Sequence, residues 1–230
     1  MSERGVALIL VLLVMMTLSA LSMSLAMMVS TESRVAANYR DGIEVSYGAE
    51  AALERVLPDL AAASDLNGVL AGVTVSSLID GPAGLRRLPD GTFTDLRALT
   101  SMVNCGRPVC SDVDLDEVRD DRPWGPNNPR WHLYAYGRLT ADPSTTLGAG
   151  GAWVYAAVWV ADDPSETDLD PFTDGGPSTL PGAGDEDNPG RGRLALTAHA
   201  YGPNGTRRVI EATVSRGEQG LSVLSWREIR

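Results

Sequence analysis

The sequence predicts an α+β protein in which one long N-terminal helix packs on a C-terminal antiparallel β-sheet. Three observations lead to this fold class. An uninterrupted apolar run covers Val6–Val29, helical periodicity continues through Glu32–Leu60, and segments rich in β-branched and aromatic residues follow from Trp131 onward. These features indicate one folded domain carried on a helix that is long enough to cross a membrane.

The run Val6–Val29 contains no charged residue, and none occurs between Arg4 and Glu32. At about 1.5 Å per residue, a helix over this run would be roughly 36 Å long. The hydrocarbon core of a bilayer is about 30 Å thick, so the helix can cross it with some tilt. We therefore expect residues 6–29 to be the transmembrane half of the helix and residues 30–60 to be its amphipathic half.

The start of the chain allows three interpretations. A secretory signal peptide has an apolar core of about 7–15 residues and a small-residue cleavage site. Ser24–Ala26 resembles such a site, but the apolar run is longer and its charged flank is not positive. A plain membrane anchor needs no cleavage. In the third interpretation residues 1–5 form a leader that is cut between Gly5 and Val6, because a residue without a side chain lets the backbone enter a narrow protease cleft.

The second half of the helix is predicted from its periodicity. Apolar and aromatic residues recur every three or four positions, which places them on one face. The periodic positions are Val35/Ala36, Tyr39, Ile43, Tyr47, Glu50, Leu53, Leu57 and Leu60, of which only Glu50 is neither apolar nor aromatic. Pro58 should end or kink this helix, since proline cannot donate to the backbone ladder and clashes with the preceding turn.

Residues 61–130 are predicted to be irregular, because Gly, Pro, Asn and Asp interrupt them throughout. Only Thr94–Asn104 has helical character, with Thr94 as its N-cap. Cys105 and Cys110 follow, and a close pair of this kind in an exported domain predicts a disulfide that closes a tight loop. Two buried reduced thiols are the alternative. A metal site would need two further ligands, and none lies nearby in the sequence.

Residues 131–230 are predicted to form an antiparallel β-sheet head of five strands. Their segments alternate in apolar character or are rich in aromatic and β-branched residues. They are Trp131–Thr140, Ala152–Ala161, Arg193–Tyr201, Arg207–Ser215 and Leu221–Trp226. An Asn204-Gly205 turn joins the third strand to the fourth. We expect one face of the sheet to be buried against the outer half of the helix and the other to remain in water.

The charge balance and the sparse reactive residues argue against several classes of function. The net charge is −11, so the surface repels nucleic-acid phosphates and no nucleic-acid partner is expected. The two histidines, His132 and His199, lie within predicted strands as ordinary sheet residues. The sequence contains no nucleophile elbow, phosphate loop or paired metal-ligand spacing. We expect a protein that is not an enzyme and that needs no cofactor.

The segment Asp162–Gly190 is acidic and nearly free of apolar residues, which predicts a long mobile surface loop. Asp185–Gly190 begins like a calcium loop, but Pro189 stands where a third ligand belongs and Leu196 where a bidentate Glu belongs. The prediction is a solvated loop without a metal. The alternative is calcium held by some of the residues Asp162, Asp163, Asp168, Asp170, Asp174, Asp185 and Asp187.

Two tryptophans are candidates for a recognition surface. Trp124 and Trp131 flank the start of the first predicted strand. Tryptophans in such places usually cover the edge of a core, so packing is the simpler explanation for both.

The N-terminal residues resemble a known family. After a leader that ends in Gly5 come the apolar helix, the stretch Ala37–Asp41 (ANYRD) and the stretch Ala49–Leu53 (AEAAL). In this order, and over roughly Gly5–Leu57, the chain resembles the PilX-type minor pilins, a type IV pilus assembly protein family. The resemblance implies a pilin-like fold and a prepilin peptidase that cuts before Val6. It also implies assembly with other pilins, major and minor, through the N-terminal helix on an inner-membrane assembly platform.

One position departs from the major pilins. Counted from Val6, the fifth residue is Leu10, whereas major pilins carry a Glu there that is thought to pair with the free amine of a neighbouring subunit. A carboxylate in lipid is costly without such a partner. Leu10 therefore implies a minor subunit that primes filament assembly or sits at or near the tip. Helix contacts are expected through the small residues Ala20, Ser22, Ser24 and Ala26.

The implied location is the inner membrane, with a single span and the head outside the cytoplasm, and then the pilus at the cell surface. Two alternatives stay open. A tip pseudopilin of a type II secretion system would share the N-terminal features but should carry a larger helical insertion in its head. A membrane-anchored adhesin or calcium-binding surface domain would keep residues 1–5.

Overall fold

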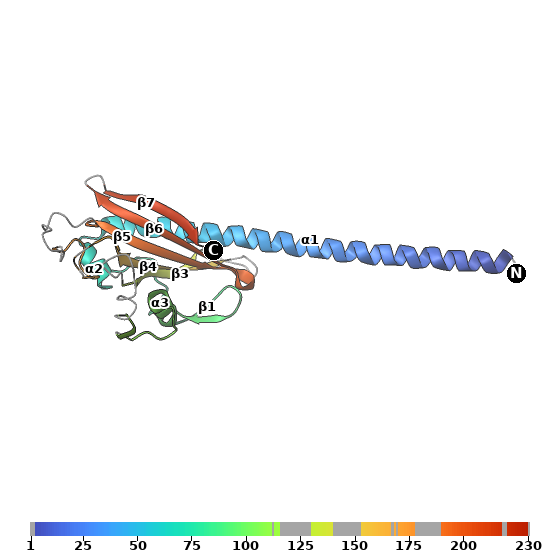
Figure 1. Cartoon of the computed structure of the whole chain (residues 1–230), viewed down its shortest axis with the longest axis horizontal. Helices are drawn as coiled ribbons and strands as arrows, with labels where there is room; N and C mark the ends of the chain where they lie inside the picture. The colour runs from blue at the N-terminus through green and yellow to red at the C-terminus, as the bar shows by residue number, and fades with distance from the viewer. Residues whose placement is uncertain are drawn as a thin grey trace. The chain divides into compact units, whose positions relative to one another are not determined.

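The structure, a computed structural model, describes residues 3–111, 113–115, 130–139, 153–166, 168, 170–177, 190–217 and 220–229. The chain divides into an N-terminal unit, Met1–Asp41, and a C-terminal unit, Gly42–Arg230. One helix, α1 (Glu3–Ala62), supplies the N-terminal unit and the first part of the C-terminal unit. The α+β class is confirmed, because within the C-terminal unit α1 packs on a five-stranded antiparallel sheet (Figure 1).

Of the two outcomes predicted at Pro58, an end or a kink of α1, the structure excludes the end. The helix does not end at Pro58 but continues to Ala62. Leu60, beyond the proline, is 0% exposed in the core, so tertiary burial outweighs the local cost of proline in a helix. The guanidinium of Arg216 donates to the carbonyl oxygens of Leu60 and Ala63. The carbonyl groups at this helix end are therefore satisfied by a residue of the sheet.

The sheet has the strand order β3-β4-β5-β6-β7, and every neighbouring pair is antiparallel. The strands are β3 (His132–Leu139), β4 (Val154–Asp162), β5 (Arg193–Tyr201), β6 (Arg207–Gly217) and β7 (Gly220–Ile229). All five predicted strands are confirmed, and β6 and β7 extend further than predicted because they pair with each other from Val209 and Ile229 at one end to Gly217 and Gly220 at the other. The β5–β6 connection turns at Asn204 and Gly205, with φ of 56° and 72°, as an Asn-Gly turn requires.

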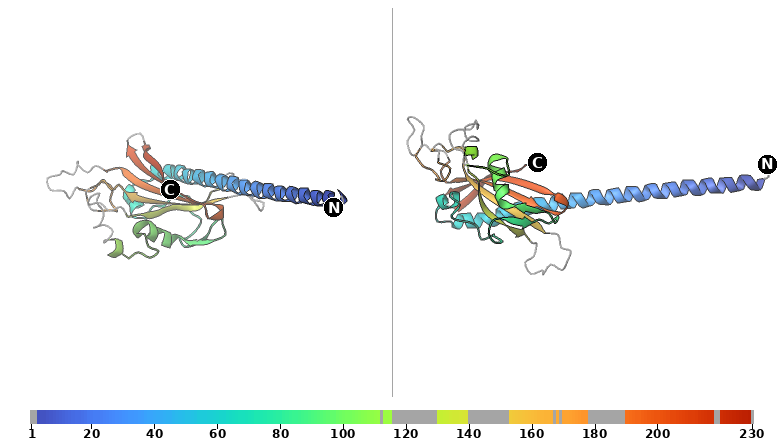
Figure 2. Two further views of the ribbon diagram at one scale, coloured as in Figure 1. Left: turned by 45° about the vertical axis from the view of Figure 1, so that its right-hand side comes forward. Right: turned by 90° about the horizontal axis from the view of Figure 1, so that it is seen from below.

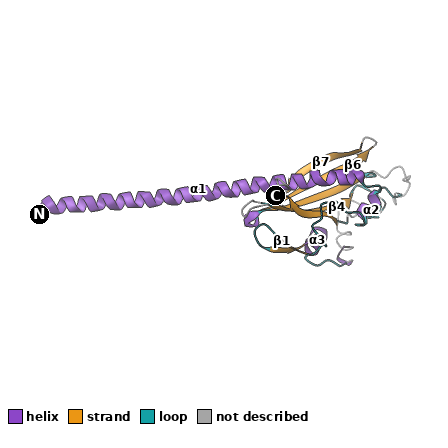
Figure 3. Ribbon diagram, turned by 180° about the vertical axis from the view of Figure 1, so that it is seen from behind, coloured by secondary structure: helices purple, strands orange, loops and turns teal. Residues whose placement is uncertain are grey.

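One face of the sheet packs against α1 and holds the larger core (Figure 3). The close approach of helix and sheet depends on glycine. A Cβ built on Gly48 in α1 would lie 2.6 Å from Val154 Cγ1 in β4. Val45 likewise packs where a side chain on Gly202 would collide with it. These two glycines let the helix backbone sit directly on the sheet.

The opposite face of the sheet is also covered, which corrects the prediction that it remains in water. The hairpin of β1 (Leu85–Arg87) and β2 (Phe93–Asp95) and the helix α3 (Leu96–Cys105) lie over this face (Figure 2). The indole N–H of Trp159 in β4 donates to Thr100 Oγ1 in α3 at 2.9 Å. Because both faces are covered, all nine residues of β4 are buried.

The region predicted to be irregular therefore contains more structure than one helix. The helix α2 (Leu66–Leu70) begins at its N-cap, Asp65, and packs into the core beside α1. For α3 the sequence predicts Thr94 as the N-cap, whereas the structure has Asp95, whose carboxylate accepts from the N–H of Arg97. Thr94 is instead paired within the short hairpin, a contact that local sequence does not reveal.

Candidate functional site

The N-terminal unit presents an apolar helix surface. Between Leu8 and Val29 the large apolar side chains are 46–78% exposed. By length and composition, the stretch of α1 that starts at Ala7 can cross a membrane. A continuous apolar surface of this kind is stable when lipid or other apolar helices cover it. The predicted transmembrane character of this segment is supported on those grounds.

The hydroxyl groups inside this stretch are satisfied by the helix itself. Thr17, Ser19 and Ser22 each donate to a carbonyl oxygen three or four residues earlier, at 2.8–2.9 Å. A hydroxyl bonded in this way does not face hydrocarbon unpaired, which lowers the cost of placing it in lipid. These polar residues therefore do not oppose membrane insertion.

The residues predicted to mediate helix contacts lie on the same stretch. Leu10, the position at which the chain departs from the major pilins, also lies on this stretch and is 59% exposed. Ala20 and Ser24 are four residues apart, as are Ser22 and Ala26, so each pair lies on one side of α1. Small residues at this spacing let two helix backbones approach closely. The spacing suits such contacts, and the contacts themselves stay a prediction.

The predicted cleavage pair, Gly5 and Val6, lies in the first turns of α1, which begins at Glu3. A peptidase needs an extended substrate, so cleavage between these residues requires the start of the helix to unwind. Helix ends open readily, because their first N–H groups have no partner within the helix. The assignment of residues 1–5 as a leader stays a prediction.

The family model described as PilX N-terminal matches residues 4–54. The chain carries a PilX-type N-terminal segment. The match covers 51 of the 230 residues and includes the apolar stretch, Leu10 and both short motifs quoted above. No curated protein and no solved structure matches the chain.

The PilX-type segment contributes two different surfaces to this protein. Its first part is the exposed apolar stretch of the N-terminal unit. Its last part, the Ala49–Leu53 motif, packs in the C-terminal unit, where Ala49 and Ala52 are 0% exposed and Leu53 is 5% exposed. The small side chains of Ala49 and Ala52 let α1 approach the sheet, in the same way as Gly48. The segment thus combines an uncovered apolar surface with the helix that organises the larger core.

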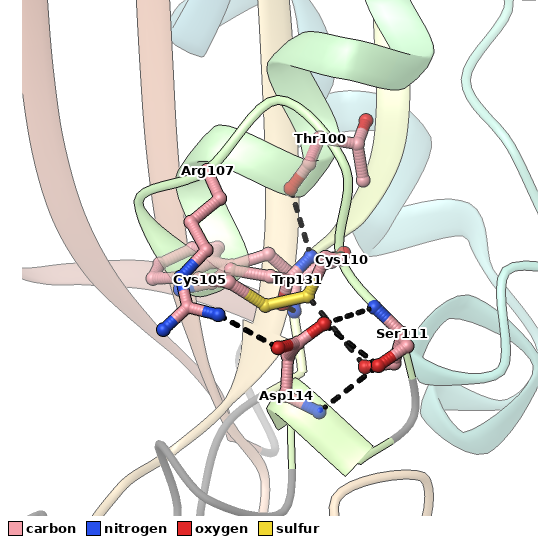
Figure 4. Close-up of a disulfide and its surroundings, with 8 residues drawn as sticks. Thr100, Cys105, Arg107, Cys110, Ser111, Asp114 and Trp131 are labelled. Carbon is pink, nitrogen blue, oxygen red and sulfur yellow. Dashed lines mark hydrogen bonds and ion pairs between the residues drawn. A yellow bond between two sulfur atoms is a disulfide. The ribbon is translucent and has the colours of Figure 1, made fainter.

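The predicted disulfide between Cys105 and Cys110 is present, with the two Cα atoms 6.1 Å apart (Figure 4). Cys105 is the last residue of α3, and Gly106 ends this helix in the left-handed conformation with φ of 69°. Asp114 accepts from the guanidinium of Arg107 in the loop at 2.8 Å. The bridge and this ion pair together hold one short loop at the end of α3.

Trp131 is held in place by Asn104, the residue before the bridge. The side-chain amide of Asn104 donates to the carbonyl oxygen of Trp131 at 3.0 Å and accepts from its N–H at 2.9 Å. Trp131 and Glu211 both line two hollows of about 300 and 670 Å³, the smaller beside α3 and the larger reaching β7. Trp131 also packs against the core on the α3 side of the sheet, as the simpler explanation predicts. Its role in recognition stays a prediction, and Trp124 lies outside the described residues.

The start of the acidic segment is buried, which contradicts the prediction of a solvated loop for this part. Asp162 and Glu166 are 0% exposed and Asp168 is 8% exposed. One carboxylate oxygen of each lies within 4.8 Å of the others. The carboxylate of Glu166 accepts from the N–H of Gly175 at 2.8 Å, and that of Asp168 accepts from the N–H of Gly176 at 2.7 Å. The segment folds back on itself to bury these groups.

Glu166 is absent from the residues that the sequence predicts as calcium ligands. The pKa of Glu166 is raised to about 8, first by burial and then by the charges of Asp162, Asp174 and Asp168, while the N–H of Gly175 acts in the opposite direction. Carboxylates this close suit either a shared proton or a cation such as calcium. Glu166 lies four residues after Asp162 and two residues before Asp168. This closeness in sequence is the signal that could have placed it among the candidate calcium ligands.

The other candidate calcium ligands are not brought into this cluster. Asp163 accepts from Ser165, Asp170 from Phe172 and Asp174 from Gly192, so each stabilises a local turn. Asp185 and Asp187 lie outside the described residues.

Both histidines have structural surroundings. His199 is 5% exposed, and the guanidinium of Arg207 lies 3.1 Å from its Nδ1. Burial lowers the pKa of His199 to about 3, and the charge of Arg207 contributes in the same direction. Burial also lowers the pKa of His132, with a contribution from Arg130. Neutral imidazoles fixed within strands fit the ordinary sheet residues that the sequence predicts.

Proposed function

We propose that this chain is a minor pilin of a type IV pilus system, which primes filament assembly or sits at or near the filament tip. The observation that carries this proposal is a PilX-type segment whose apolar residues 8–29 form an exposed helix surface. Lipid covers such a surface before assembly, and the helices of other pilins cover it afterwards. Both surroundings are apolar, so the transfer between them requires no desolvation of charge. The function is structural and not enzymatic.

Leu10 supports a position at the start of the filament. A Glu at this depth is tolerated only where it meets a partner. A subunit that enters the filament first lacks a neighbour on one side, so a carboxylate there would stay unpaired. An apolar side chain such as Leu10 removes that requirement, which suits a priming or tip subunit.

The disulfide supports a location of the C-terminal unit outside the cytoplasm. Bridges such as Cys105–Cys110 persist in oxidising compartments and are rare in the cytosol. In this proposal a prepilin peptidase removes residues 1–5, the protein waits in the inner membrane, and an assembly platform brings α1 together with the helices of other pilins. The mature protein then resides in the pilus.

The described helices favour a pilus over a type II secretion system. Apart from α1, two α-helices lie with both ends inside the described part of the chain. They are α2, of five residues, and α3, of ten residues. A tip pseudopilin should carry a larger helical insertion, and these two short helices do not provide one.

Processing and assembly can be tested together in the organism that makes the protein. Mass spectrometry of the native chain should show an N-terminus at Val6. The Gly5→Leu variant should keep residues 1–5 and reproduce the pilus defect of a deletion strain, while Ser2→Ala should be processed and piliated normally. A native chain that retains Met1, together with unchanged piliation in the deletion strain, would show that the protein is an uncleaved anchor and not a pilin.

A further inference from the structure

We propose that the hollow of about 300 Å³ between α3 and the sheet is a binding site for a small molecule in which an apolar ring or short chain carries a carboxylate. The inference concerns the C-terminal unit alone and does not depend on pilus membership. It rests on two buried polar side chains with hydrogen bonds left to make, and on an arginine beside them.

One wall of the hollow is apolar. Leu99, Met102 and Val103 lie three and four residues apart on α3, so they share one side of that helix. Trp131 and Val209 extend this wall from the sheet. The volume lies at the lower end of the range for small-molecule sites, which is about 300–1,000 Å³. A hollow of this size suits a single ring or a short chain.

The sheet side of the hollow is polar. Thr197 and His199 are two residues apart on β5, so their side chains lie on the same face of the sheet. They are 4% and 5% exposed, and both line the hollow. This is the face under α3, because the indole of Trp159, which contacts the ring of His199, belongs to the core on that side.

The contacts of His199 determine which of its ring nitrogens carries the proton. The guanidinium of Arg207 lies 3.1 Å from Nδ1. Burial and the charge of Arg207 both lower the pKa of His199, so the ring is neutral. A guanidinium can only donate a hydrogen bond, so Nδ1 accepts and the proton is on Nε2.

The N–H at Nε2 has no acceptor within the described part of the chain. Both polar contacts of His199, with Arg207 and with the hydroxyl of Tyr201, involve Nδ1. The hydroxyl of Thr197 likewise makes no hydrogen bond to a described residue. Neither atom is sealed inside the protein without a partner, so both open into the hollow that these residues line. A ligand with an acceptor group can replace the water there and make the same hydrogen bonds.

The charge of Arg207 favours an acid over a neutral molecule or a base. The bond to His199 uses one of its N–H groups and leaves its charge in place, because the imidazole is neutral. No carboxylate of a described residue pairs with Arg207. Glu211, the acidic residue in the wall, is bound by Arg227 at 2.6 Å. A carboxylate beside Arg207 would therefore gain charge-assisted hydrogen bonds.

The test uses the full chain in phosphatidylcholine nanodiscs, with isotope-labelled histidine. The chain has two histidines, and His199→Gln identifies which signals belong to His199. NMR of the imidazole nitrogens should show the proton on Nε2 of His199 in the free protein. Benzoate should shift these signals saturably. Acetate, which lacks the ring, and benzylamine, which carries the opposite charge, should bind at least tenfold more weakly.

Two variants test the residues that recognise the acid. Arg207→Gln should weaken benzoate binding by about tenfold or more, because a charge-assisted hydrogen bond is lost. Arg208→Gln is the matched control and should bind normally, since Arg208 pairs with Glu228 and lies on the α1 side of the sheet. Thr197→Val keeps the shape of the side chain without its hydroxyl and should bind severalfold more weakly. An unchanged His132 signal shows that each variant is folded.

Three results would overturn the proposal. The absence of a saturable shift at His199 would show that the hollow holds water only. Equal binding of acetate or of benzylamine would show that it does not select an apolar acid. An unchanged affinity of Arg207→Gln would place benzoate elsewhere. None of these measurements involves N-terminal processing or piliation, so a failure here is distinct from a failure of the pilin proposal.

Discussion

Arg216 in β6 donates a hydrogen bond to the carbonyl oxygen of Ala63, just beyond the end of α1, at 2.9 Å across a sequence separation of 153 residues. A second bond from the same nitrogen reaches the carbonyl oxygen of Leu60. The last turn of α1 has no basic residue of its own. A cation at a helix C-terminus satisfies unpaired carbonyl groups and complements the helix dipole. The sheet thus stabilises the end of the helix that covers it.

Arg216→Ala should lower the free energy of unfolding of the C-terminal unit by about 1–3 kcal/mol, because the carbonyl groups of Leu60 and Ala63 lose their donor. Denaturant unfolding of the detergent-solubilised chain, followed by intrinsic tryptophan fluorescence, to which buried Trp159 contributes, measures this change. Arg227→Ala is the control. Its pair with Glu211 is at the surface and should contribute less than about 1 kcal/mol. Equal losses in the two variants would contradict the capping role.

Gly48→Ala should destabilise the C-terminal unit, although alanine is the better helix former by about 1 kcal/mol. The new Cβ would lie 2.6 Å from Val154 Cγ1 and would force helix and sheet apart, at a cost of about 1–3 kcal/mol. Gly42→Ala is the matched control in the same helix. Its Cβ would meet only the end of the Arg208 side chain, so the change should be neutral or stabilising. A stabilising effect of Gly48→Ala in the same unfolding assay would show that this close approach is not required.

The double variant Cys105→Ser with Cys110→Ser should lower the free energy of unfolding by about 2 kcal/mol, because the bridge closes only a short loop of the unfolded chain. The strands and α1 should persist, which circular dichroism can confirm. The wild-type protein under reducing conditions is the control and should match the variant. Complete loss of secondary structure in either sample would assign the disulfide a larger role than holding one loop.

Glu166 should make stability depend on pH. Its pKa is raised from an ordinary 4.5 to about 8, so the folded state retains a proton that the unfolded state loses. The stabilisation is fully present below the unfolded value and is lost as the pH rises through the folded one. His199, with its lowered pKa, has the opposite effect below about pH 6.5. The window from about pH 6.5 to about pH 8 therefore isolates Glu166.

In that window the free energy of unfolding of the wild-type protein should fall, whereas that of Glu166→Gln should change much less, because an amide does not titrate. Denaturation curves in the presence of a chelator measure both. A Glu166→Gln protein that keeps the full pH dependence would assign the effect to another group.

Leu10→Glu should weaken membrane insertion when the chain is made without other pilins. A carboxylate inside the apolar stretch has no partner there, and a charged residue in a span costs about 1–3 kcal/mol, depending on depth. The fraction of protein that inserts, measured by a protease-protection assay in membrane vesicles, should fall severalfold. Leu10→Ile is the control and should insert like the wild type. Unchanged insertion of Leu10→Glu would show that this position does not face lipid.

The parts of the fold that were predicted correctly depend on local pattern. The apolar run Val6–Val29, the composition or alternation of the five strand segments and the turn at Asn204 and Gly205 each follow from neighbouring residues. The same is true of the bridge between Cys105 and Cys110, which are the two cysteines of the sequence and lie five residues apart.

The parts that were predicted wrongly depend on residues far apart in the chain. An end of the helix at Pro58, one of the two outcomes predicted there, does not occur, because Leu60 beyond it is buried by the sheet. The second face of the sheet is shielded from water because the β1–β2 hairpin and the short helix α3 cover it and bury Trp159.

By itself, then, the sequence determined the membrane-length helix, the strand segments and the identity of the bridged cysteines, because each depends on side-chain period or on closeness along the chain. Only the tertiary structure decided that Glu166 is buried beside Asp162 and Asp168 and that, within the described part of the chain, β7 pairs on one side only. Burial and strand pairing depend on contacts between segments that are far apart in the sequence, and a local sequence pattern does not predict those contacts.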